Sequence, residues 1–129
     1  MSLKEEMDHV AVELALEPQS AARARAIISS LETDADSSSL DHARLLASEL
    51  IADALATEPR SQDAAITVEA QMLDGTNRVM VAFHGLALDV PADTPEPAAP
   101  GWGIHLVRTL ANRWGIQRAN GSTYVWFEA

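Results

Sequence analysis

The stretch AITVEAQMLDGTNRVMVAFH, residues 65–84, decides the fold of this chain. Its two halves, AITVEAQML and RVMVAFH, are rich in the β-branched and apolar residues that favour strands. The residues between them, DGTN, are a strong signal for a hairpin turn. The stretch therefore predicts two antiparallel strands that neighbour each other in a sheet.

The segment before this hairpin predicts one strand and two helices. In HVAVELALEP the side chains of Val10, Val12 and Leu14 fall on one face, which is the pattern of a half-buried strand, and Pro18 ends it. Residues 19–31 and 40–57 are predicted to be helical, separated by the polar loop ETDADSSS. In the second of these helices, acidic residues flank the apolar stripe.

The segment after the hairpin begins with a proline-rich stretch, residues 86–100, which predicts a long irregular loop. A third helix is predicted over residues 103–114, GIHLVRTLANRW, with Gly115 as its C-cap. Asn120-Gly121 predicts a second hairpin turn between strands at 115–119 and 122–129. Trp114 and Trp126 are expected in or near the core.

The order of these elements predicts the fold class. Strands and helices do not alternate regularly, so a doubly wound parallel sheet is not favoured. We expect an α+β protein, a two-layer sandwich of a mostly antiparallel sheet with helices on one face. The length of 129 residues fits a single domain over residues 1–129.

Composition narrows the classes of partner. The net charge is −10, Lys4 is the lone lysine and the eight arginines are scattered, which argues against binding to nucleic acid. There is no apolar run long enough for a membrane span and no visible secretory signal. The absence of cysteine excludes disulfides. These features predict a cytoplasmic protein whose partners are proteins or small molecules.

Two acids in SELIADALAT, residues 48–57, form the first candidate site. Glu49 and Asp53 lie one helical turn apart beside the apolar stripe. Together they could hold Mg²⁺ and leave one carboxylate to act as a general base. The alternative is that both acids only solvate the flank of the helix.

The second candidate is GWGIHLV, residues 101–107. Gly101 and Gly103 lead directly into a helix, whose first N–H groups attract phosphate. The pattern is neither a P-loop nor a dinucleotide fingerprint, and a simple loop hinge would have the same sequence. Trp102, between the glycines, would either stack on a ligand or partner, or pack the loop down.

Taken together, order and spacing resemble the anti-sigma factor/serine-protein kinase family of Bergerat-fold, histidine-kinase-like ATPases. LDHARLLASELIADALAT is similar to the family helix that runs Ser-Glu-Leu-Val-Thr-Asn-Ala-Val-x-His. PGWGIHLVRTLANRWGIQRANGSTYVWFE is similar to the C-terminal half, Gly-x-Gly-Leu-x-Leu-Val-x-x-Leu-Ala-x-x-Trp-Gly and then Gly-x-x-Val-Trp-Phe. The second match is the more specific, and the resemblance spans the chain from about residue 9 to its end.

The resemblance implies a Bergerat fold and a role for each matching residue. Glu49 matches the catalytic base, and Asp53 takes the place of the asparagine that holds Mg²⁺ between the phosphates of ATP. Residues 86–100 would form the ATP lid. The other positions that match the nucleotide site are Gly85, Gly101, Gly103 and Thr123.

Several departures from the family pattern fall on this site. The family's Asp-x-Gly, whose aspartate binds the adenine amino group, is FHG here, so Phe83 replaces the aspartate. Losing that hydrogen bond costs about 1–3 kcal/mol. Asp53 adds a negative charge beside the phosphates, Thr57 replaces the histidine after the helix, and Trp102 replaces the lid arginine.

The resemblance therefore implies an anti-sigma-factor-like regulator of transcription that acts by protein–protein binding, with nucleotide binding weakened or lost. Its partner would be a sigma factor or an anti-sigma antagonist protein, and a homodimer is also compatible with the family. The alternative is an active ATP-dependent serine-protein kinase that uses ATP and Mg²⁺. A nucleotide or small-ligand sensor, with Phe83 stacked on a ring, is a third hypothesis. All three require the helix of Glu49 and the helix after Gly103 to share one face of the sheet.

Overall fold

The structure, a computed structural model, describes residues 9–31, 37–57, 61–73, 76–97 and 99–129. Its elements, in chain order, are β1 (His9–Ala15), α2 (Ser20–Ser29), α3 (Ser37–Ala56), β2 (Ala65–Leu73), β3 (Thr76–His84), α4 (Trp102–Leu110), β4 (Arg113–Ala119) and β5 (Ser122–Glu128).

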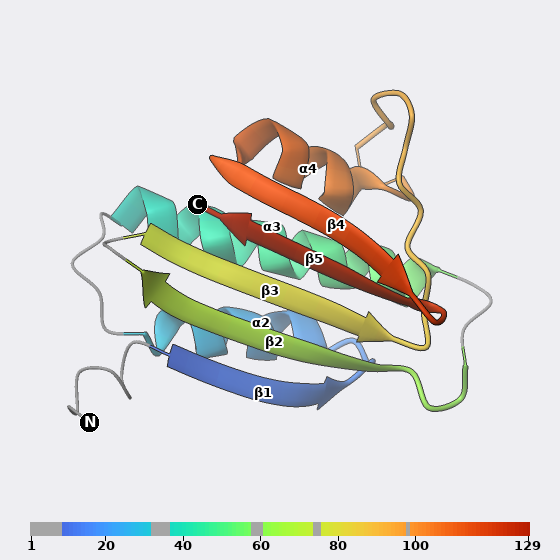
Figure 1. The fold of residues 1–129 in the computed structure, drawn as a ribbon, viewed down its shortest axis with the longest axis horizontal. Coiled ribbons are helices and arrows are strands. Elements are labelled where there is room, and N and C mark those ends of the chain that lie inside the picture. Colours follow the sequence, from blue (N-terminus) through green and yellow to red (C-terminus); the bar gives the residue numbers. More distant parts are fainter. Residues whose placement is uncertain (1–8, 32–36, 58–60, 74–75, 98) are drawn as a thin grey trace.

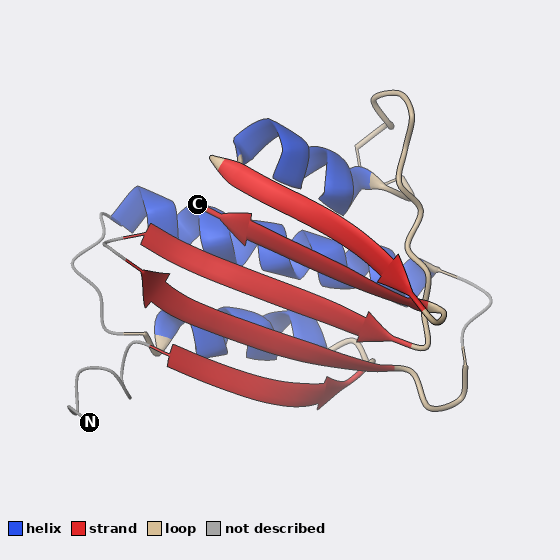
Figure 2. Cartoon of the chain, viewed as in Figure 1, coloured by secondary structure: helices blue, strands red, loops and turns tan. Residues whose placement is uncertain are grey.

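The described strands form one five-stranded sheet in the order β1-β2-β3-β5-β4, and every neighbouring pair is antiparallel. The three helices all lie on one face of this sheet, and its other face is not covered by any described element (Figures 1 and 2). The predicted α+β class and the two-layer arrangement are confirmed. The antiparallel pairing predicted for the strands within residues 65–84 is also confirmed, because β2 and β3 pair along their whole length. Asp74 and Gly75 of the predicted turn lie outside the described residues, and Thr76 and Asn77 belong to β3.

The core lies between the sheet and the helices. Alternate side chains of the strands point to it, for example Val79 and Val81 of β3 and Phe127 of β5, all fully buried. The opposing layer is the apolar stripe of α3, which includes Leu46 and Leu50, also fully buried. The predicted stripe of α3 is therefore the face that holds the two layers together.

Helix α3 packs against α2 on one side and α4 on the other. The closest approach to α4 is at Gly103, where a Cβ atom would lie 2.7 Å from the backbone oxygen of Glu49. Only glycine allows the two helix backbones to come this near. The two helices that carry the candidate residues thus lie side by side on one face of the sheet.

The prediction for the third helix is wrong at its C-terminal end. Helix α4 ends at Leu110 rather than at residue 114, and Ala111 is extended, with φ −75° and ψ 145°. The N–H of Asn112 donates to the carbonyl of Glu128 at 2.8 Å, and β4 begins at the next residue. Pairing with β5 supplies hydrogen bonds that the helical periodicity of residues 104–114 could not reveal.

The two tryptophans are not core residues, which corrects a second expectation. Trp114 belongs to the edge strand β4 and is 40% exposed. Trp126 is half-buried on the uncovered face, where its indole lies against Gly115. The predicted turn between β4 and β5 is confirmed, because Asn120 and Gly121 both have positive φ, at 53° and 78°.

We predict that Gly103→Ala destabilises the protein by about 2–3 kcal/mol, because the new methyl group would force α3 and α4 apart. Gly121→Ala is the matched control, since no atom lies within 4 Å of a Cβ at that position. It should cost about 1 kcal/mol, from the positive φ alone. Urea unfolding of both variants checks this, and equal losses would contradict the close contact.

Candidate functional site

The candidate site is the seam between α3 and α4, and Asp53 is its central residue. The side chain of Asp53 is 9% exposed, and its Oδ2 accepts the N–H of Gly103 at 2.8 Å. The N-cap residue of α4 is Gly101, with φ 90° and no side chain to bind the first free N–H groups. A carboxylate from another helix therefore caps α4, where the helix dipole favours negative charge.

The environment of Asp53 makes it a weak acid. The pKa of Asp53 is raised from 3.8 to about 6, and burial is the largest cause. The hydrogen bonds from the backbone of Gly103 and Ile104 oppose this rise, whereas the charges of Glu49 and Asp89 contribute to it. Near neutral pH the carboxyl is thus charged but titrates within reach of mild acid.

Glu49 lies one turn before Asp53 on α3 and is half-buried. Its backbone touches Gly103, so both predicted acids lie at the first turn of α4. The structure thereby brings together four of the predicted site residues, namely Glu49, Asp53, Gly101 and Gly103. This grouping joins segments about fifty positions apart in the chain.

The first part of the predicted lid, residues 86–91, is bound to the body of the protein, and we call it the strap. Leu86 and Leu88 are 2% and 1% exposed, so the strap contributes to the core. The hydroxyl of Thr123, itself fully buried, donates to the carbonyl of Leu86 and accepts the N–H of Leu88, both at 3.1 Å. Thr123, predicted near an adenine pocket, uses its hydroxyl to hold this strap.

Two arginines also hydrogen-bond the backbone of the strap. Arg118 of β4 donates to the carbonyl of Leu88, and Arg108 of α4 donates to the carbonyl of Pro91 at 2.7 Å. Pro91 also packs on Gly101, where a Cβ atom would lie 2.9 Å from its Cδ. The strap therefore closes over the N-terminal end of α4.

The remaining predicted residues lie around this seam without facing a common space. Phe83 is fully buried in the core cluster. Gly85 has φ 74° and turns the chain out of β3, and its N–H donates to the hydroxyl of Ser122 at 3.1 Å. Trp102 is the first residue of α4 and its ring stacks on His105 at 5.1 Å. This contact lies within α4, so it tests neither of the two interpretations of Trp102, stacking on a ligand or partner and packing the loop down.

These residues do not fit a bound nucleotide in the conformation that the structure has. Asp53 hydrogen-bonds the backbone of α4, and Thr123 hydrogen-bonds the backbone of the strap. Phe83 has no exposed surface on which a base could stack. Nor do three or more acidic, histidine or cysteine side chains converge on a metal-sized centre among the described residues. Asp53, the residue predicted to bind Mg²⁺, caps α4 in this structure.

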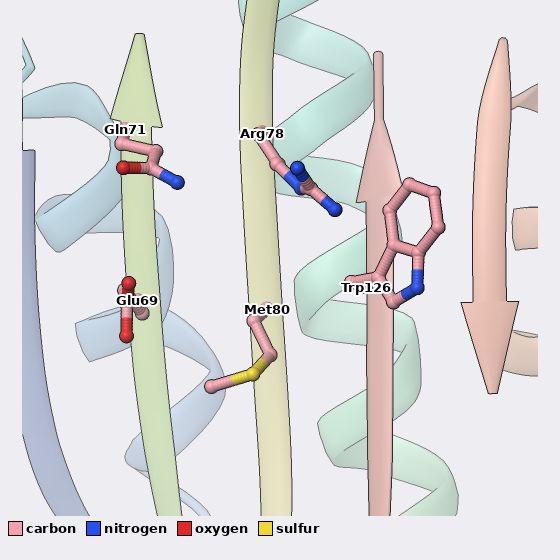
Figure 3. A pocket seen from close by; sticks show the side chains of 5 residues that line it. All are labelled: Glu69, Gln71, Arg78, Met80 and Trp126. Carbon is pink, nitrogen blue, oxygen red and sulfur yellow. The ribbon is translucent and has the colours of Figure 1, made fainter. Parts of the chain in front are cut away.

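A hollow of about 230 Å³ lies on the uncovered face of the sheet (Figure 3). Its walls come from β2, β3 and β5: Glu69, Gln71, Arg78, Met80 and Trp126. The guanidinium of Arg78 lies 4.5 Å from the centre of the Trp126 ring. Sequence reasoning missed this group, because the residues sit at the outward positions of three separate strands. The strict alternation along those strands was the signal that could have found it.

Comparison with protein-family models and with curated proteins identifies no relative of this chain. No protein-family model matches the chain, and no curated protein matches it significantly. None of the described helices has both the length and the apolar composition needed to cross a lipid bilayer.

We predict that Asp53→Asn stabilises the protein at pH 8 and changes it little at pH 4. The raised pKa means that the folded state holds a proton between about pH 4 and 6 that the unfolded chain releases, so stability falls as pH rises through this window. Asparagine keeps an acceptor for Gly103 without the buried charge. The gain at pH 8 should be on the order of 2 kcal/mol.

Urea unfolding at the two pH values measures this difference. Asp93→Asn, at an exposed position of the 86–100 loop, removes the same charge outside the seam and is the control. An Asp53→Asn effect that is the same at pH 4 and pH 8 would contradict the assigned titration.

Proposed function

We propose that this protein is an anti-sigma-factor-like regulator that acts by binding a partner protein, and that its nucleotide binding is weakened or lost. One observation carries the proposal: the polar groups that match the family's nucleotide site bind the protein's own backbone. Asp53 caps α4 and Thr123 holds the strap. A nucleotide would have to replace both sets of contacts before it gained any of its own.

The energetics favour the loss of nucleotide binding. The carboxylate that would accept the adenine amino group is replaced by Phe83, so a buried donor would lack its partner, at a cost of about 1–3 kcal/mol. At neutral pH Asp53 and Glu49 place negative charge beside any phosphate. Opening the strap would expose Leu86 and Leu88, and this exposure would cost roughly 1.5–3 kcal/mol for each side chain.

The partner is proposed on the resemblance and on charge. The family implies a sigma factor or an anti-sigma antagonist, and the net charge of −10 suits a basic protein partner better than nucleic acid. A regulator that acts by binding a partner does not need to catalyse a reaction at the seam. The closed seam would instead keep α3 and α4 rigid beside each other.

An active serine-protein kinase remains the second candidate, and the grouping of acids favours it. Glu49 and Asp53 lie one turn apart at the N-terminal end of α4, where backbone N–H groups attract phosphate. In that case Glu49 would accept the proton of a seryl hydroxyl. This reaction requires the strap to open and Asp53 to release Gly103.

We predict that titration calorimetry with Mg-ATP detects no binding at micromolar affinity in the wild-type protein. Asp53→Asn removes the charge and restores the amide of the family, yet it too should fail to bind tightly, because Phe83 and the strap are unchanged. Micromolar binding by the wild type would overturn the proposal. Tight binding by the variant alone would show that the Asp53 charge, rather than the closed seam, prevents nucleotide binding.

The regulatory role is tested separately by binding to the sigma factors and anti-sigma antagonists of the source organism. We expect a complex with one of them that forms equally well with and without Mg-ATP. A complex that requires Mg-ATP, or transfer of labelled phosphate to an antagonist serine, would support the kinase instead. The lack of a complex with every such protein would reject both.

A further inference from the structure

The charge of this protein is distributed unevenly along the chain. Although the net charge is −10, residues 97–127 contain three arginines and no acid. The arginines are Arg108, Arg113 and Arg118. This stretch forms α4, β4 and most of β5, so the positive charge gathers along one side of the sheet.

Among the described strands, that side ends in an edge strand. β4 is the last strand of the sheet, and α4 is the helix beside it (Figure 1). An edge strand presents unpaired backbone N–H and C=O groups that another extended chain can bind. β1 is the opposite edge, but it carries Glu13 and is followed by Glu17, so its charge is negative.

The β4 edge also exposes apolar surface. Trp114 is 40% and Leu110 36% exposed, and they are two of the four large apolar side chains exposed among the described residues. The guanidinium of Arg108 lies 5.7 Å from the centre of the Trp114 ring. Arginine by itself would guard an edge against aggregation. An exposed indole next to it is instead typical of surfaces that partners bury.

The register assigns each side chain of β4 to a face. Trp114 and Arg118 pair with the buried Phe127 and Thr123, so both lie on the helix side of the sheet. Arg113 pairs with Glu128 on the uncovered side, where the two side chains form an ion pair at 3.6 Å and the guanidinium of Arg113 also lies 6.0 Å from the Trp126 ring. An added strand would therefore meet Arg118 on one face and the ion-paired but exposed guanidinium of Arg113 on the other, with an apolar side chain opposite Trp114.

We propose that the β4 edge binds an extended acidic segment of a partner protein, which adds to the sheet as a sixth strand. The segment carries acids opposite Arg113 and Arg118 and an apolar residue opposite Trp114. This surface stands apart from the α3–α4 seam, and the proposal does not depend on the proposed anti-sigma function. Charge selects β4 over β1 as the docking edge.

The test uses a fluorescein-labelled peptide, Thr-Glu-Thr-Val-Thr-Ile-Glu, whose antiparallel pairing with residues 113–119 places its glutamates opposite the two arginines. Fluorescence anisotropy should show saturable binding that weakens as salt increases. Arg113→Glu should weaken binding at least about fivefold, because it replaces an attraction with a repulsion. Arg25→Glu, on the exposed side of α2, changes the net charge equally and should leave the affinity within about twofold.

Two further probes separate strand addition from simple charge attraction. Because alternate backbone groups of a strand face its neighbour, N-methylation of one alternating set of peptide amides should abolish binding while methylation of the other set is tolerated. Equal effects of the two sets would overturn strand addition. A single-stranded DNA that bound as tightly as the peptide would assign the edge to polyanions in general and overturn the proposal, as would no peptide binding up to millimolar concentration.

Discussion

The hydrogen bond from the N–H of Gly103 to the buried carboxylate of Asp53 is the contact on which the arrangement of the helices depends. It satisfies the start of α4 with a group from α3, and it does so where the two backbones approach too closely for any side chain but hydrogen. Because the carboxylate lies out of water, its charge opposes folding while its hydrogen bond favours it. The same residue therefore stabilises the seam through its hydrogen bond and destabilises it through its charge, and the destabilising charge appears as pH rises.

The strap follows from the position of α4. Once α4 lies beside α3, Arg108 faces the carbonyl of Pro91, and the hydroxyl of Thr123 in β5 meets the backbone of residues 86 and 88. The proline-rich loop, which by composition alone would be free, is therefore tied to the protein at its first six residues. Residues that match positions of the family's nucleotide site serve here as structural contacts. The proposed regulatory function is based on this difference in what those residues bind.

The two faces of the sheet differ in which side chains are accessible. The helix side is filled by the core and the seam, whereas the uncovered side presents Trp126 between Arg78 and Arg113. The β4 edge lies between the two faces of the sheet. Trp114 lies on its helix side and Arg113 on its uncovered side. A protein that acts through partners would find accessible aromatic and cationic groups here, next to the acids Glu69 and Glu128.

The sequence by itself determined the α+β class, the central hairpin, the Asn120-Gly121 turn and the apolar stripe of α3, because each depends on neighbours within a few residues. It also identified the residues of the seam, since acids on a helix and glycines before a helix are visible locally. Only the tertiary structure decided that Asp53 caps α4, that α4 stops at Leu110 and that Trp114 belongs to an exposed strand. Those outcomes rest on hydrogen bonds between segments far apart in the chain, and local periodicity carries no information about such partners.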